Sequence, residues 1–191
     1  MRDGFNRPTD IAWDKAGNIF VSDGYNNSRA IKFDKNGRYV AEVGVRGAEP
    51  TQMNTPHSIQ VDNDGNVYVA DRGNSRIQVF SLDGKFLKQA FVTRDAKSSS
   101  TTGGLSFSHD PGQTFLYVAD QGNSKVHILL RETLEEVGSF GQEGKEPGNF
   151  IAPHQLATDL NGNLYTVEVK GGERAQRFLF KGYKPKTVST R

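Results

Sequence analysis

The feature that most constrains this chain of 191 residues is a sequence unit that occurs four times. Three copies align almost without gaps, beginning at Pro8, Pro56 and Pro153, and a looser copy runs from about 104 to 138. The three aligned copies share an Asp-x-x-Gly-Asn turn, in which glycine takes a positive φ, at 14–18, 62–66 and 159–163. Repeated units of this size bury their hydrophobic faces against one another, so the repeat predicts a modular fold.

Within each unit the order of turns and strands is constant. A short alternating strand follows the first turn, at 19–21, 67–69, 116–118 and 164–166. A second connection, a third strand, an Asn-Gly or Asp-Gly turn and a fourth strand come next in the clearest copies. Four short strands in about 40 to 50 residues are typical of a β-propeller blade, whereas a β-sandwich would not repeat three distinct turns in one order. We therefore predict an all-β, β-propeller fold of four-stranded blades, one domain over 1–191, with blades near 5–45, 53–91, 103–140 and 149–183.

The second connection contains a recurring Asp…Asn-Ser-Arg or Lys pattern, at 23–29, 71–76 and 120–125. In a repeat protein such a pattern is more often architectural than functional, since the Asp can accept turn amides and the cation can reach the neighbouring blade. The Asp62–Asn66 segment resembles the start of a calcium loop but lacks the distal bidentate Glu that such a loop requires. We interpret it as a turn.

Composition excludes several classes of site. The chain has no cysteine, so it has neither disulfides nor thiolate metal sites. Its 24 basic and 22 acidic residues are interleaved and give a net charge of +2, which favours neither nucleic acid nor an acidic surface as a partner. Apolar runs fall short of the roughly 18 residues that span a membrane, so no membrane partner is expected.

Two histidines occupy equivalent positions in the repeat. His57 and His154 each follow a proline and begin the first strand of their units, where Thr9 stands in the first unit. The first strand of a blade lies nearest the propeller axis, so these side chains should line one mouth of the central channel. His109 and His127 lie outside this register, and we expect both at the surface.

The number of blades decides how these two histidines meet. In a six-bladed ring two blades correspond to about 120°, so histidines on alternate blades would converge as in a three-histidine zinc site with an open fourth position. In a four-bladed ring they would face each other. The sequence supplies two of three such ligands.

With these residues in view, the chain resembles a known family. The segments Phe5–Ala12, Val21–Arg29, Pro56–Ser58 and Val69–Gln78 are similar to those of the peptidyl-α-hydroxyglycine α-amidating lyases, which are six-bladed, zinc-dependent propellers of NHL repeats. The likeness is close over 5–91, moderate over 150–180 and only at the level of the repeat between them. It implies cleavage of a peptidyl-α-hydroxyglycine substrate to a peptide amide and glyoxylate, in a secreted or periplasmic setting, although the first residues carry no apolar signal core.

The resemblance also assigns roles. It implies that His57 and His154 are zinc ligands, that Tyr25 is a general acid or base, and that Arg72 steadies a carboxylate or oxyanion. Gln155 stands where the family has an Asp that helps to hold calcium, which argues against calcium.

The departures from the family leave other functions open. The family's first zinc histidine and a second arginine lie in a blade without a counterpart here, so we expect an incomplete ring, or one completed by another copy, and self-association through open blade edges. We then expect Met1 to be an internal start, a fragment boundary, or the start of a chain that completes its ring through another copy. The alternatives are an inactive scaffold that binds a protein or glycan at the channel mouth, and an RNA-binding face, which the balanced charge disfavours.

Overall fold

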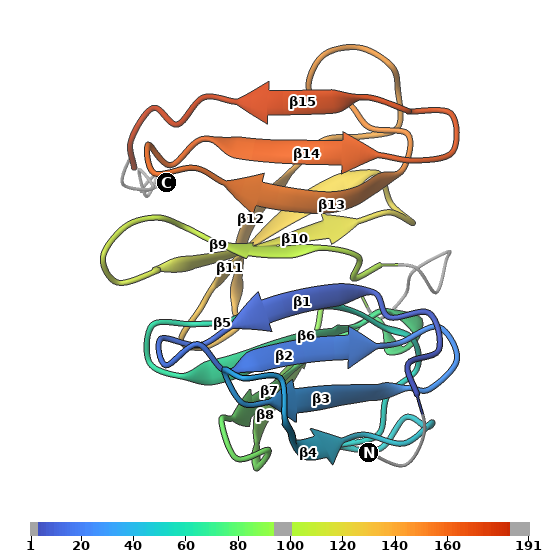
Figure 1. Cartoon of the computed structure of the whole chain (residues 1–191). Coiled ribbons are helices and arrows are strands. Elements are labelled where there is room, and N and C mark those ends of the chain that lie inside the picture. Colours follow the sequence, from blue (N-terminus) through green and yellow to red (C-terminus); the bar gives the residue numbers. More distant parts are fainter. Residues whose placement is uncertain (1–3, 94–100, 184–191) are drawn as a thin grey trace, which may run out of the picture.

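The computed structural model describes residues 4–93 and 101–183, which form four antiparallel sheets (Figure 1). The first two sheets are β1 (Asp10–Trp13), β2 (Ile19–Asp23), β3 (Arg29–Phe33) and β4 (Tyr39–Val43), then β5 (Pro56–Val61), β6 (Asn66–Asp71), β7 (Arg76–Ser81) and β8 (Phe86–Phe91). The others are β9 (Leu105–Phe107), β10 (Phe115–Asp120), β11 (Lys125–Leu130) and β12 (Glu136–Phe140), then β13 (Pro153–Thr158), β14 (Leu164–Glu168) and β15 (Ala175–Phe178). A short 3₁₀ turn, η1 (Arg72–Asn74), lies between β6 and β7.

Each sheet is a meander, and its strands lie in chain order from the inside outwards. The first strand of each sheet lies beside the first strand of the next, from β1 to β5, β9 and β13. This arrangement confirms the all-β propeller of four blades. The expectation of four strands in every blade is wrong for the described part of blade 4, where β15 is the last strand.

The tight turns explain the regular spacing of the strands. In the first, Asp14 Oδ1 accepts hydrogen bonds of 2.9 Å from the amides of Ala16 and Asn18, and Gly17 has φ +84°. The turns at 62–66 and 159–163 repeat these contacts. An Asp that caps its own turn and a glycine with positive φ fix the hairpin, so the predicted turns are confirmed.

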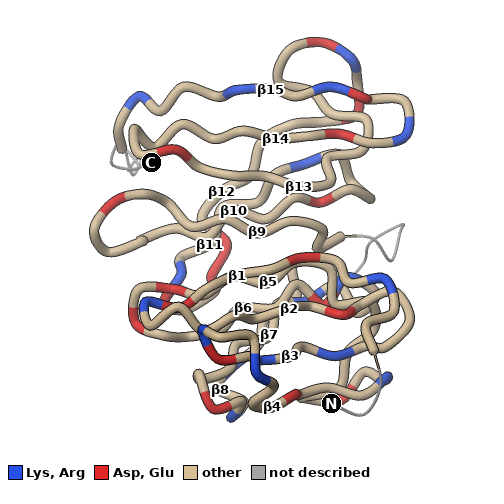
Figure 2. Tube along the Cα trace, in the orientation of Figure 1, with Lys and Arg blue, Asp and Glu red and all other residues tan. Residues whose placement is uncertain are grey.

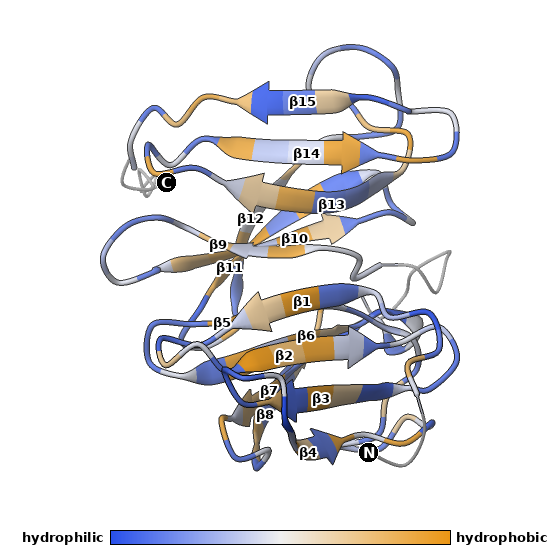
Figure 3. Cartoon of the chain, viewed as in Figure 1, coloured by the Kyte–Doolittle hydropathy of each residue, from blue (hydrophilic) through white to orange (hydrophobic). Residues whose placement is uncertain are grey.

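The core lies between blades rather than within them. Apolar side chains from facing sheets form one cluster at each of the three blade interfaces. Between blades 2 and 3, for example, Tyr68 packs against Phe107 with ring centroids 5.0 Å apart. The most hydrophobic stretches accordingly lie within strands such as β2 and β14, and most turns are hydrophilic (Figure 3).

A buried acid ends the second strand of every blade, at Asp23, Asp71, Asp120 and Glu168. Asp71 accepts a 2.8 Å hydrogen bond from Arg76, whose guanidinium also donates to the carbonyls of Ala48, Glu49 and Gln52. These carbonyls belong to the linker that leads into blade 2. The architectural interpretation therefore holds, and the arginine binds the linker that leads into its own blade.

The expectation for His127 is wrong. Its ring is buried in blade 3, and Nε2 lies 2.9 Å from Asp120 Oδ2, where blade 2 has Gln78 beside Asp71. His109 is exposed, as expected. Across the fold, acidic and basic residues are interleaved along the chain (Figure 2).

The first and fourth blades each have a strand in which some side chains pack into a core and alternate apolar side chains are exposed. Ile11 and Trp13 of β1 are 44% and 57% exposed, and Tyr165 and Val167 of β14 are 36% and 45% exposed. Self-association stays a prediction, and these residues are where we expect its contacts.

Candidate functional site

Four side chains that sequence reasoning singled out meet at one mouth of the channel. His57 and His154 stand at the starts of β5 and β13, and their ring centroids are 4.5 Å apart with planes at 84°. Tyr25 comes from the β2–β3 loop, and its hydroxyl lies 3.2 Å from His57 Nε2. Arg72, in η1, places its guanidinium carbon 5.3 Å from the centre of the Tyr25 ring. The structure therefore brings together residues from blades 1, 2 and 4.

The tautomer of His57 follows from its contacts. Nδ1 lies 3.1 Å from the Gly103 carbonyl, which can only accept, so Nδ1 carries the proton. Nε2 then has a free lone pair, which accepts from the Tyr25 hydroxyl. A ring held by a backbone carbonyl at one nitrogen, with a lone pair at the other, is the state in which histidine ligates metals.

Both imidazoles are neutral at pH 7. Burial, the Arg72 charge and His154 lower the pKa of His57 to about 4, against a small opposing effect of the Gly103 carbonyl. Burial, Arg72 and Lys170 lower the pKa of His154 below its ordinary value. The mouth thus disfavours a proton on either ring and leaves both available as ligands.

A pair of glycines in blade 3 lets the two histidines meet, and sequence reasoning missed it. Gly103 and Gly104 occupy the positions of His57 and Ser58 in blade 2. A Cβ at Gly103 would lie 2.9 Å from the His154 carbonyl, and one at Gly104 would lie 2.8 Å from the Gln155 Cα. Only glycine lets β13 approach β9 this closely. The Gly-Gly pair, in the copy of the repeat that aligns least well, was the one sequence signal of this close approach.

A second polar layer lies one residue further along these strands. Ser58 Oγ donates to Asp10 Oδ2 at 2.6 Å, and the Leu105 amide donates to Ser58 Oγ at 3.2 Å. Gln155 directs its amide nitrogen toward Asp10 at 3.4 Å and accepts from the Leu156 amide through its oxygen. Asp10 Oδ2 is thus paired with donors from blades 2 and 4 in this layer.

The donor set fits part of a zinc site. Two neutral imidazoles match zinc's preference, but a catalytic zinc uses three protein ligands beside an open position. In 4–93 and 101–183 no three His, Asp or Glu side chains are grouped closely enough to hold an ion. A third ligand would have to come from outside these residues.

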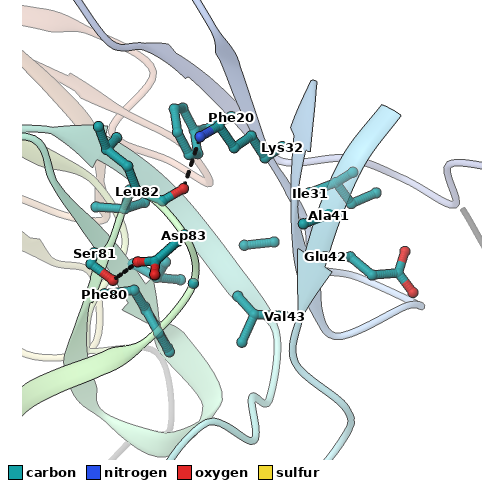
Figure 4. Close-up of a pocket in the computed structure, with 14 residues that line it drawn as sticks. Phe20, Ile31, Lys32, Ala41, Glu42, Val43, Phe80, Ser81, Leu82 and Asp83 are labelled. Carbon is teal, nitrogen blue, oxygen red and sulfur yellow. Dashed lines mark hydrogen bonds between the residues drawn. The ribbon is translucent and has the colours of Figure 1, made fainter. Parts of the chain in front are cut away.

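Other hollows lie away from this mouth. Figure 4 shows a cavity of about 130 Å³ between the outer strands of blades 1 and 2, bordered by apolar side chains such as Phe20, Val43 and Phe80. The Lys32 amine at its rim donates to the Leu82 carbonyl at 2.9 Å. This cavity lacks the converging polar groups of the histidine mouth. In the described part of the chain, no helix is long and apolar enough to cross a membrane.

Comparison with known proteins places this geometry in context. The NHL repeat family matches residues 53–80, which form most of blade 2. Human NHL repeat-containing protein 3 is 30% identical over 183 residues, covering 92% of this chain and 50% of the relative. A probable peptidyl-alpha-hydroxyglycine alpha-amidating lyase of Caenorhabditis elegans is 46% identical over 80 residues, covering 40% of this chain and 23% of the relative. The chain thus spans half or less of these relatives' lengths.

Solved structures agree on the fold. Virginiamycin B lyase of Staphylococcus aureus superposes with a TM-score of 0.68 at 12% identity, covering 95% of this chain and 58% of that one. At this identity the likeness concerns architecture alone. Taken together, the repeat, the fold and the relatives identify the chain as an NHL-repeat β-propeller that has the peptidyl-α-hydroxyglycine α-amidating lyases and NHL repeat-containing protein 3 among its homologues.

Proposed function

We propose that the histidine mouth is the active site of a lyase that cleaves peptidyl-α-hydroxyglycine to a peptide amide and glyoxylate. The observation that carries the proposal is the meeting of Tyr25, His57, Arg72 and His154 in one mouth, with a hydroxyl, two neutral imidazoles and a guanidinium as neighbours. The similarity to the amidating lyase of Caenorhabditis elegans supports the same chemistry.

Zinc is the cofactor that this donor set would take. His57 would use Nε2, and His154 would be the second ligand, while a third would come from outside the described residues, for example from another copy. Bound zinc would polarise the substrate hydroxyl and lower its pKa. The carbonyl of Gly103 keeps the proton on Nδ1 and so orients the His57 ring for this task.

Tyr25 is the group placed to move protons. In the reaction the hydroxyl loses its proton, its oxygen becomes the aldehyde oxygen of glyoxylate, the C–N bond breaks, and the amide nitrogen takes up a proton. The Tyr25 hydroxyl lies 3.2 Å from His57 Nε2, the atom that would hold the metal. In its deprotonated form Tyr25 would accept the proton of the substrate hydroxyl and pass it to the amide nitrogen when the C–N bond breaks.

Arg72 supplies positive charge to the same place. Its guanidinium lies over the Tyr25 ring, and no carboxylate in the described part of the chain is within ion-pair distance of it. A planar guanidinium with free donors suits the substrate carboxylate or the developing oxyanion.

The test is release of glyoxylate from benzoyl-α-hydroxyglycine by protein supplied with zinc. We expect Tyr25→Phe to lower kcat/KM by about 10²-fold or more, as for the loss of a general acid–base. Tyr39→Phe is the matched control, because Tyr39 is also exposed but packs on Phe33 far from the mouth. His57→Ala should remove both turnover and bound zinc. Turnover that survives Tyr25→Phe, or zinc that survives His57→Ala, would overturn the assignment.

A scaffold function is the second candidate. It is favoured by the match to NHL repeat-containing protein 3 over 92% of this chain and by the lack of a three-ligand cluster in the described residues. In that case the mouth binds a protein or glycan without turnover. Zinc-supplied wild-type protein that binds but never releases glyoxylate would favour this function.

A further inference from the structure

The loops between the second and third strands reach the mouth in a repeated way. In each of three blades, one backbone amide of this loop donates to a carbonyl just before the first strand. The bonds join Tyr25 to Arg7 at 3.5 Å, Arg72 to Thr55 at 3.3 Å, and Val169 to Ala152 at 3.0 Å. Each acceptor lies two residues before the position that begins the first strand at the mouth, namely Thr9, His57 and His154. The loops of blades 1, 2 and 4 are therefore docked in similar places. Lys170 follows Val169 and stands two residues after Glu168, as Tyr25 stands two residues after Asp23.

Lys170 occupies a conformation that does not favour a lysine. Its φ is +49°, in the left-handed region, and Gly171 follows at +91°. Glycine would adopt this geometry without cost, whereas a residue with a Cβ is uncommon there. The side chain is exposed, so core packing does not account for it.

Two cations act on the histidine pair without an acid to balance them. Arg72 and Lys170 both lower the pKa of His154, so both charges are felt at its ring. No carboxylate in residues 4–93 or 101–183 is within ion-pair distance of either cation. By contrast, Arg76 and Arg174 are held by Asp71 and Glu168. The two cations that lower the pKa of His154 therefore have no ion-pair partner among the described residues.

We propose that Lys170 is a specificity-determining residue that, together with Arg72, binds the free carboxylate of the ligand held at the His57–His154 mouth. The inference rests on the proposed function for the identity of the ligand, a small α-hydroxy or α-oxo acid at the end of an acyl chain. Two cations near a pair of neutral imidazoles favour an anion and disfavour the corresponding ester or amide, which cannot form either ion pair.

The experiment measures binding and turnover separately. Glyoxylate binding to the wild-type chain, followed by NMR at low salt with and without zinc, reports on the anion site even if no turnover occurs. Lys170→Gln should weaken binding about fivefold, as for a partly exposed ion pair, and Lys170→Arg should restore it. Lys181→Gln is the matched control, because Lys181 is also exposed but follows β15 at the opposite end of blade 4.

Turnover provides the second readout. For benzoyl-α-hydroxyglycine, Lys170→Gln should raise KM about fivefold with kcat little changed, and the preference over the methyl ester should fall by the same factor. Unchanged glyoxylate binding and unchanged KM in Lys170→Gln would overturn the inference and leave the lyase proposal intact. Normal, Lys170-dependent glyoxylate binding without any turnover would overturn the lyase proposal and leave the anion site intact.

Discussion

Blades 2 and 3 each have a buried acid at the end of the second strand, but the partner of that acid differs between them. In blade 2, Asp71 is paired with Arg76, whose guanidinium also holds the carbonyls of the linker. In blade 3, Asp120 is paired with His127, and a second carboxylate, Glu136, lies 3.1 Å from the other ring nitrogen without forming a hydrogen bond. The repeat fixes where the acid lies and lets its partner vary. A permanent ion pair in one blade thus becomes a titratable one in the next.

The same two blades also differ at the mouth. Blade 2 begins its first strand with His57 and Ser58, whereas blade 3 has Gly103 and Gly104 at these places. His57 is one of the site residues, and the two glycines leave space for His154 to lie close to it. An irregular unit in a repeat protein is therefore part of the site, because it sets the distance between its regular neighbours.

The largest expected effect concerns the ion pair of blade 2. Arg76→Met should lower the free energy of unfolding by about 3–5 kcal/mol, because it leaves the buried Asp71 without its cationic partner and removes the donor of the linker carbonyls. Guanidinium chloride unfolding measures the loss. Arg38→Met, at an exposed arginine, is the control, and Asp71→Asn combined with Arg76→Met should recover much of the stability. A loss below about 1 kcal/mol would contradict the pairing seen here.

Sequence reasoning reached much of the fold and part of the site. The turns at 14–18, 62–66 and 159–163 were predictable because an Asp that caps its own turn and a following glycine are local features. The convergence of His57 and His154 followed from register, since equivalent positions in successive blades face one axis. Tyr25 and Arg72 were identified only from the family resemblance, because nothing in their spacing indicates that their side chains point toward the mouth.

Contacts between residues far apart in the chain could not be predicted from the sequence. His127 was expected at the surface because it lies on a third strand, outside the register of His57 and His154, and its pairing with Asp120 depends on hairpin register. The closeness of Gly104 to Gln155 depends on how β9 and β13 pack, which no local pattern encodes. Likewise, the binding of Arg76 to linker carbonyls needs the path of a segment that has no regular structure.

The histidine of blade 2 should make stability depend on pH. Its folded pKa of about 4 lies below the ordinary 6.5, so the unfolded chain takes up the proton first as pH falls. His57 therefore contributes fully above pH 6.5, and between pH 6.5 and 4 the metal-free protein should lose about 3 kcal/mol. Thermal unfolding in chelator, compared with His57→Gln, isolates this contribution. Identical pH profiles for the two proteins would refute it.

The glycine pair of blade 3 provides a steric test. Gly104→Ala should lower the free energy of unfolding by about 1–3 kcal/mol, because the new Cβ meets the Gln155 Cα at 2.8 Å and forces β13 away from β9. Gly138→Ala, in β12 of the same blade, is the control, since a Cβ there has nothing within 4 Å. The variant should also weaken zinc binding, because His154 moves with β13. Equal stability of the two variants would show that the close approach costs nothing.

The smallest expected effect is at His127, and its sign is opposite to that at His57. Burial lowers the pKa of His127, but Asp120 and Glu136 outweigh it and raise the pKa above 6.5. The stabilisation is therefore complete below pH 6.5 and is lost as pH rises through the raised value. His127→Gln gives blade 3 a glutamine at the position of Gln78 in blade 2. The substitution should lower the free energy of unfolding by about 1 kcal/mol below pH 6.5 and remove its pH dependence above pH 6.5. Unfolding followed from pH 5.5 to 8.5, with His109→Gln at the exposed histidine of the same blade as control, measures this. If His127→Gln kept the wild-type dependence of unfolding free energy on pH, Asp120 would not need a charged partner. Blades 2 and 3 would then differ in sequence at this position but not in electrostatics.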